Sequence, residues 1–167
     1  TSREPTAMRD LRIAVITPHP PSQGTLNEYG YHFVRHLRAK AEVAEVIAQF
    51  PGPASVNVYG VRVAGEEGRA GMVSLTWPDA SRFDPKAFHE FAVERLATYA
   101  VPMFVRISRA ADLTATFKLR KIDLQREGYD PQRTADPLYV RDAKAGTYVP
   151  VTRENLLALA IMPFAGD

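Results

Sequence analysis

The spacing of hydrophobic residues predicts one strand followed by one helix at the start of the chain. Residues 11–17 (LRIAVIT) form a short apolar run rich in β-branched side chains, which is typical of a buried strand. Prolines beginning with Pro18 end this run. Between residues 26 and 37, apolar side chains recur at close to helical spacing. The first 40 residues therefore predict a single Rossmann-like βα unit.

From residue 42 onward, helices alternate with short strands. Two β-rich segments on either side of the glycine-containing turn 64–69 predict a hairpin. Asp84 and Pro85 predict a helix start, because aspartate caps helices and proline suits the first helical position, while Gly128 suits a left-handed cap. The expected helices span about 42–50, 84–99, 120–126 and 152–162, and the expected extended segments span 56–63, 70–77, 103–107, 136–141 and 146–150. This order predicts an α+β fold with a small mixed sheet, a hairpin and flanking helices.

The composition is that of an ordinary globular protein, with 46% hydrophobic and 24% charged residues among 167. A formal net charge of +2 does not favour a nucleic acid partner. The chain has no cysteine, which excludes disulfides and thiolate metal sites and fits a reducing compartment. No apolar run reaches the roughly 18 residues of a membrane span, and residues 1–10 lack the apolar centre of a signal peptide. We therefore expect a cytoplasmic protein with no membrane span.

The most distinctive motif is the basic string LTATFKLRK at residues 113–121. It stands within an ordered set of strings, namely EVAEVIAQFPG, NVYGV, GRAGM, a helix that begins at FDP and ends in tyrosine, PMFVRI, REGYDP, DPLYVRD and GTYVP. The set resembles the C-terminal lobe of the fatty-acid transport protein and very-long-chain acyl-CoA synthetase family, a branch of the adenylate-forming (AMP-binding) enzymes. The resemblance covers about residues 42–163 and departs from the family at Ala115, where glycine is usual.

This resemblance implies that Lys118 is the lysine that neutralises charge when a carboxylate attacks the α-phosphate of ATP. Such a cation acts electrostatically on the crowded phosphorus centre rather than by proton transfer. For the complete family enzyme the resemblance implies ATP, Mg²⁺ and coenzyme A (CoA), whereas this chain alone is expected to bind no cofactor. The alternative is that Lys118 is a solvated surface lysine, which is the usual place for this side chain.

The glycine-rich turn GEEGRAG at residues 65–71 is a second candidate site. In the family, the hairpin region of this lobe approaches the pantetheine of CoA during thioester formation. The resemblance therefore assigns cofactor contacts to Gly65, Gly68, Arg69 and Gly71, because glycine permits close approach to a phosphopantetheine arm. The alternative is a glycine-rich hairpin turn with no ligand.

Residues 1–41 carry a separate and weaker resemblance. Their PPSQGT loop at 20–25 is similar to the first βα unit of retaining glycosyltransferases, near the nucleotide-sugar cleft. A helix N-terminus suits a phosphate, but one glycine is not a dinucleotide-binding fingerprint, and a plain structural βα unit is the alternative. We therefore expect a chimera of a glycosyltransferase-like segment (1–41) and an acyl-CoA synthetase C-terminal lobe (42–167).

Three functions follow from these patterns. The sequence shows no Ser/Thr/Gly-rich loop of the kind with which the family grips ATP. We therefore expect a detached C-terminal lobe of a long- or very-long-chain fatty acyl-CoA synthetase, inactive alone, whose partner is a separate adenylation core. The alternatives are a nucleotide-sugar-binding fragment of a glycosyltransferase and a non-catalytic interaction module.

The histidines do not predict a metal site. His32 and His36 are spaced by four residues, as zinc ligands on a helix can be, but no HExxH motif and no nearby carboxylate accompany them. His19 and His89 stand apart from each other and from this pair.

Overall fold

The computed structural model describes residues 40–66, 68–109 and 117–163, except for the side chains of 117–121. The chain divides into two compact units, residues 1–38 and 39–167. The predicted βα unit, the PPSQGT loop and the histidine pair near its end lie outside the described residues.

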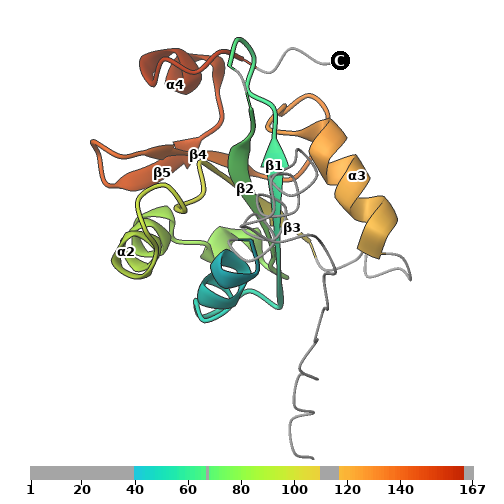
Figure 1. Ribbon diagram of the computed structural model, residues 1–167, viewed down its shortest axis with the longest axis vertical. Helices are drawn as coiled ribbons and strands as arrows, with labels where there is room; N and C mark the ends of the chain where they lie inside the picture. Colours follow the sequence, from blue (N-terminus) through green and yellow to red (C-terminus); the bar gives the residue numbers. More distant parts are fainter. Residues whose placement is uncertain (1–39, 67, 110–116, 164–167) are drawn as a thin grey trace, which may run out of the picture. The chain divides into compact units, whose positions relative to one another are not determined.

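A five-stranded mixed sheet forms the centre of the second unit (Figure 1). Its strands are β1 (Ser55–Val61), β2 (Ala70–Thr76), β3 (Phe104–Ser108), β4 (Leu138–Asp142) and β5 (Thr147–Pro150), in that spatial order. β2 and β3 are parallel, because helix α2 (Pro85–Arg95) crosses over between them, and all other neighbours are antiparallel. The predicted α+β fold with a mixed sheet, a hairpin and flanking helices is confirmed.

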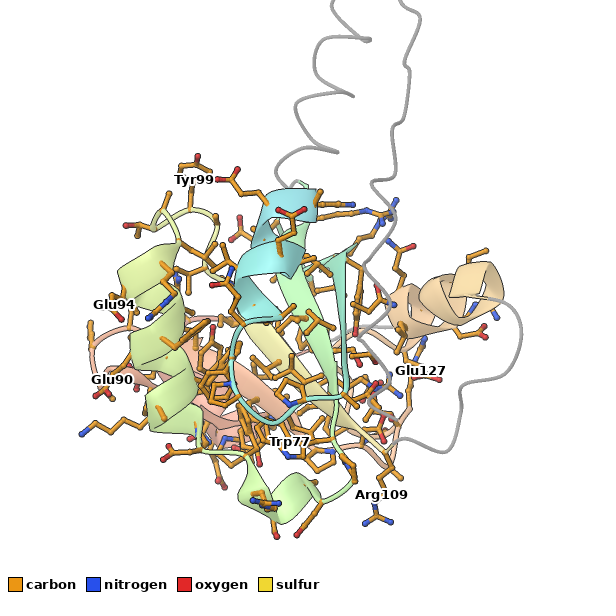
Figure 2. All side chains as sticks on the ribbon, turned by 90° about the horizontal axis from the view of Figure 1, so that it is seen from below. Trp77, Glu90, Glu94, Tyr99, Arg109 and Glu127 are labelled. Atoms are coloured by element: carbon orange, nitrogen blue, oxygen red, sulfur yellow. The ribbon has the colours of Figure 1, made fainter. Side chains whose placement is uncertain are left out.

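Capping residues that the sequence makes visible begin α2 and the last described helix, α4 (Arg153–Ala158). The Asp84 carboxylate accepts hydrogen bonds from two backbone N–H groups of α2, both at 3.0 Å, as its place before Pro85 predicted. Glu90 and Glu94 project from the outer side of this helix (Figure 2). Thr152 caps α4, which ends short of the predicted residue 162. A further helix over residues 40–47 corresponds to the one expected over 42–50.

Helix α3 (Phe117–Glu127) begins earlier than the sequence predicted. The sequence predicted this helix only from about residue 120, which left Lys118 before it, but Lys118 belongs to the first helical turn. The physical reason is that residues 117–127 contain neither glycine nor proline, so nothing in their propensities stops the helix from extending toward its N-terminus. At the other end, Gly128 has φ 56°, which is the left-handed cap that the sequence predicted.

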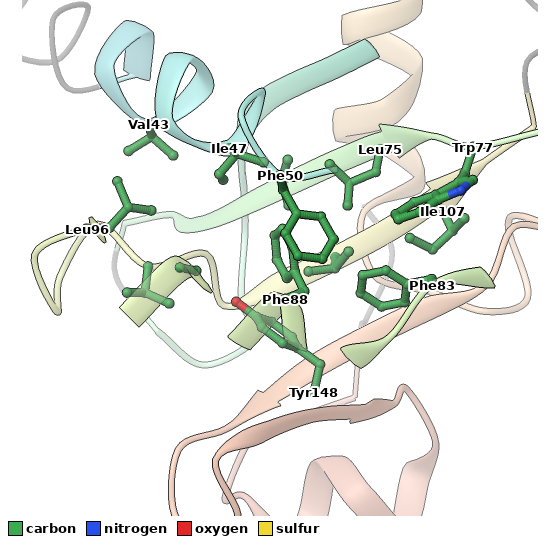
Figure 3. Close-up of a cluster of buried hydrophobic side chains, with 14 residues drawn as sticks. Val43, Ile47, Phe50, Leu75, Trp77, Phe83, Phe88, Leu96, Ile107 and Tyr148 are labelled. Carbon is green, nitrogen blue, oxygen red and sulfur yellow. The ribbon is translucent and has the colours of Figure 1, made fainter. Parts of the chain in front are cut away.

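An aromatic cluster fills the face of the sheet covered by α2 and the helix over 40–47 (Figure 3). Phe88 lies at its centre and is fully buried. The ring centroids of Phe50, Phe83 and Tyr148 lie 5.2, 5.7 and 5.5 Å from that of Phe88, in tilted or edge-on arrangements. Rings at these separations add to the stability gained from apolar burial.

A second cluster fills the opposite face, under α3 and α4 (Figure 1). Its centre is a stacked pair, Phe104 and Tyr129, with ring centroids 4.3 Å apart. Alternate residues of β3 point to opposite faces, so Val105 and Ile107 belong to the aromatic cluster and Phe104 to this one. The same alternation directs Arg106 and Ser108 toward the α3 face, into a mostly apolar layer.

Replacing Phe88 by alanine is expected to lower the free energy of unfolding by about 3–5 kcal/mol, because it removes buried area and leaves a cavity among rigid rings. Chemical denaturation measures this loss. The matched control is Tyr99→Ala, since Tyr99 is 90% exposed in the loop after α2; it should change stability by less than about 0.5 kcal/mol. Equal effects of the two substitutions would contradict the assignment of the core.

His89 is expected to make the protein less stable on acidification. Burial lowers the pKa of His89 below its usual 6.5, the charge of Arg141 lowers it further, and Glu90 and Asp142 oppose the shift. Because the folded state prefers the neutral ring, the unfolded chain binds the proton first as pH falls below about 6.5. His89→Phe should therefore flatten the fall in unfolding free energy below that pH, as measured by denaturation at a series of pH values. An unchanged slope in the variant would show that other groups cause the pH dependence.

Candidate functional site

The predicted catalytic residue, Lys118, belongs to the first turn of α3. The preceding residues 110–116 and the side chains of 117–121 lie outside the described part of the chain. The role of Lys118 therefore stays a prediction. The remainder of α3, its contacts with the sheet and the surface beside it are described.

A groove of about 740 Å³ runs between the β1–β2 hairpin and α3. Its lining contains three of the four predicted cofactor-binding residues, Gly65, Gly68 and Arg69. Gly65 and Gly68 have φ angles of 79° and 96°, a backbone conformation that residues with a Cβ atom rarely adopt. The fourth predicted residue, Gly71, lies in β2 opposite Gly60 and does not line the groove. The positive φ values of Gly65 and Gly68 therefore shape the turn of the hairpin, and a Cβ at Gly68 would meet no atom within 4 Å.

The groove is basic. Arg62 and Arg69 line it from the hairpin and Arg126 lines it from α3, against one described carboxylate, Glu66. None of the three arginines forms an ion pair with another residue that the structure describes. Guanidinium groups recognise phosphate through paired hydrogen bonds. Such a lining suits an anionic ligand, with the apolar side chain of Ile122 contributing one hydrophobic contact surface.

A buried polar network joins α3 to the sheet below this groove. The Arg106 side chain is only 7% exposed. Its Nε donates a hydrogen bond to Asp136 Oδ2 at 2.6 Å. Its Nη1 donates to the carboxylate of Glu127, at the end of α3 (Figure 2). The same Asp136 oxygen accepts from the Ser108 hydroxyl at 3.1 Å, and Ser108 is hydrogen-bonded to the Ser74 hydroxyl at 2.8 Å. The network therefore connects β2, β3, α3 and the segment before β4.

Two carboxylates share the one cation of this network. Burial acts to lower the pKa of Arg106, but hydrogen bonds to Glu127 and Asp136 outweigh it and the net effect is a raised pKa. Burial also raises the pKa of the neighbouring Tyr59, an effect that the charge of Arg106 reduces. The Tyr59 hydroxyl is buried and makes no hydrogen bond of good geometry within the described residues, although Arg106 is close enough to act on it.

Sequence reasoning did not single out Arg106, Glu127 or Asp136. One signal was present, because an arginine in the middle of an apolar strand must find carboxylate partners once the strand is buried. The partners stand 21 and 30 residues further along the chain, and nothing local identifies them.

The part of the chain that the structure describes contains neither a metal-binding cluster nor a membrane-spanning helix. No group of three or more His, Asp or Glu side chains there is arranged to hold a metal ion. No helix in this part of the chain is both long and apolar enough to cross a membrane.

Relatives of known name match most of this region. The mouse Long-chain fatty acid transport protein 1 is 44% identical over 110 residues, which are 66% of this chain and 17% of that protein. The human Long-chain fatty acid transport protein 3 is 41% identical over 121 residues, or 72% of this chain and 18% of that protein. The chain thus spans less than a fifth of the length of these relatives. No family model matches the chain.

Among solved structures, a Mycobacterium tuberculosis fatty acyl CoA synthetase is 23% identical to this chain, covering 47% of it and 15% of the solved chain, with a TM-score of 0.38. That likeness is too small to support an argument about the site.

Replacing Arg106 by methionine is expected to lower the free energy of unfolding by about 3 kcal/mol, because it leaves two partly buried carboxylates without their cation. The control is Lys86→Met, since Lys86 lies 3.9 Å from Glu90 with both side chains well exposed; its effect should stay below about 0.5 kcal/mol. Denaturant titration compares the two. A loss for Arg106→Met no larger than for the control would show that the network adds nothing to stability.

Proposed function

We propose that this chain, which belongs through its matched segment to the long-chain fatty acid transport protein family, supplies the lysine-bearing C-terminal lobe of an enzyme that activates long- or very-long-chain fatty acids. The observation that carries the proposal is that α3, the helix containing Lys118, also forms one wall of the basic groove. The residues proposed for the two half-reactions of such an enzyme thus belong to one compact unit.

In the first half-reaction, a fatty acid carboxylate attacks the α-phosphate of ATP, the acyl–phosphate bond forms, and pyrophosphate leaves. Lys118 is proposed to offset the extra negative charge on the oxygens around the phosphorus. This role asks for a fixed cation and no proton transfer. Since the described residues contain no cluster suited to a metal ion, we assign Mg²⁺ to none of them.

In the second half-reaction, the thiolate of CoA attacks the acyl-adenylate carbonyl, the thioester forms and AMP leaves. The groove beside the glycine hairpin suits the phosphate-bearing arm of CoA, because its guanidinium groups can contact phosphate and its glycines permit close approach. Arg62 and Arg126 join the predicted Arg69 in this proposed role.

A fatty acid, ATP and CoA must be held together for this chemistry, and positioning supplies much of its rate. Because the chain spans under a fifth of its relatives' length, we propose that it acts with an adenylation core and that these 167 residues alone form no acyl-adenylate. We keep a cytoplasmic location as part of the proposal. The alternative functions are a nucleotide-sugar-binding fragment and a non-catalytic interaction module, and the binding experiment below distinguishes them from the proposed one.

The lysine assignment is tested by adding the chain to a fatty acyl-CoA synthetase core from which the C-terminal lobe has been deleted. Any restored acyl-adenylate formation should fall by roughly a hundred- to thousand-fold for Lys118→Ala, by analogy with the loss of one oxyanion donor. Lys121→Ala is the matched control and should reduce it much less. ATP–pyrophosphate exchange at equal chain concentrations measures both. A Lys118→Ala chain that works as well as the parent refutes the assignment, and robust exchange by the chain without any core refutes the claim that it is inactive alone.

Because the chain alone is expected to bind no cofactor, the groove assignment is tested by titrating CoA into an equimolar mixture of the chain and the lobe-deleted synthetase core, with the core alone as the blank. Arg62→Gln and Arg126→Gln should each weaken binding by about tenfold, the effect of removing one charge-assisted hydrogen bond. Arg82→Gln, in the 3-10 helix Ala80–Arg82, should leave it unchanged. Binding of a nucleotide sugar instead of CoA would favour the glycosyltransferase reading, and binding of neither would favour an interaction module.

A further inference from the structure

Helix α3 touches the sheet at few points. Leu124 is 3% exposed and packs into the second cluster, whereas Ile122, two residues earlier, is 49% exposed. The Gln125 side-chain amide donates a long hydrogen bond of 3.4 Å to the Gly60 carbonyl. Glu127, at the last turn, pairs with Arg106. With one buried apolar residue among its described side chains, α3 depends on polar contacts for its direction.

Arg106 is a rigid support for such a contact. It lies on β3, whose five residues are all buried and which pairs with β2 on one side and β4 on the other. Asp136 occupies Nε and leaves Nη1 for Glu127, so the planar guanidinium holds two carboxylates in fixed relative directions. A guanidinium bound to two carboxylates in this way restricts the angle between them as well as their distances. The packing of a single leucine, Leu124, does not restrict angles in this way.

We propose that Arg106 is a positioning residue that fixes the direction of α3, and thereby both the placement of Lys118 and the width of the basic groove. The catalytic consequence rests on the proposed function, whereas the structural part stands on the contacts alone. Arg106 itself is buried and is not among the residues that line the groove.

Helix geometry shows how far the effect reaches. Lys118 and Glu127 stand at opposite ends of α3, and the nine residue-to-residue steps from one to the other correspond to about 14 Å at a rise of about 1.5 Å per residue. A tilt of roughly 10° about the Glu127 end therefore moves the Lys118 backbone by about 2 Å. Misplacement of a reacting group by about 1 Å costs about a hundredfold in rate, so a small loss of direction is enough to impair catalysis.

The structural part is tested by amide hydrogen exchange on the full chain. Glu127→Gln should speed exchange in residues 117–127 by about tenfold or more, because local opening of α3 no longer breaks an ion pair. The matched control is Glu94→Gln, which removes an equivalent charge from an exposed Glu–Arg pair on α2. Exchange in β2 and β5 should change by less than about twofold in both variants. Faster exchange across the whole sheet, or no selective change in α3, overturns the proposal.

Two further variants distinguish a change in the orientation of α3 from a general loss of stability. Asp136→Asn removes the other carboxylate of the same guanidinium, and should loosen the segment 130–137 while changing exchange in α3 by less than about threefold. Arg106→Lys retains the charge but loses the fork, and should loosen both segments. If Glu127→Gln and Asp136→Asn give the same exchange pattern, Arg106 holds the region together without directing α3.

The catalytic part uses the core-complementation assay. Glu127→Gln should lower the maximal rate of acyl-adenylate formation at saturating chain by about tenfold or more, while the chain concentration giving half the maximal rate stays within about twofold. A merely unfolded population would instead raise that concentration. An unchanged maximal rate beside selectively faster exchange in α3 would overturn the catalytic part. If the parent chain restores no activity, the proposed function fails, and the exchange experiment still decides whether Arg106 directs α3.

Discussion

A buried guanidinium on the central strand determines how one whole face of this fold is built. Arg106 lies on a strand with no exposed residue, so its charge is removed from water and needs carboxylates within hydrogen-bond reach. Two segments distant in sequence, the end of α3 and the turn before β4, must therefore come to the same place on the sheet. That requirement accounts for Glu127 and Asp136 meeting at one point on the sheet.

The two faces of the sheet use different physical interactions. The face under α2 is held by aromatic and aliphatic packing around Phe88, which contributes free energy roughly in proportion to buried area and has little directional preference. The face under α3 combines the Phe104–Tyr129 stack with the Arg106 network, whose geometry constrains angles. Both faces contribute to stability, and the candidate site lies on the face where a polar network also constrains angles.

The position of the groove follows from this arrangement. The glycine hairpin extends from β1 and β2, and α3 lies against β1 through Leu124 and the Gln125–Gly60 contact. The Arg106–Glu127 pair adds a contact at the end of α3 to those that hold it against β1. The arginines from both walls then face a common space, where an anionic ligand meets charge from two elements at once.

The sequence by itself determined the local features and the family. The order of helices and strands follows from the spacing of apolar residues. The Asp84–Pro85 helix start and the Gly128 cap follow from hydrogen bonds within a few residues. The ordered motifs carried the resemblance that the relatives confirm. The helix expected from about residue 120 left Lys118 outside it, whereas α3 begins at Phe117, because helix propensity alone does not fix the exact start of a helix. Only the tertiary structure decided that Arg106 meets Glu127 and Asp136, and that hairpin and helix share a groove. The reason is that Glu127 and Asp136 lie 21 and 30 residues beyond Arg106. The order of the strands and the placement of α3 bring them to Arg106, and local sequence spacing does not encode either.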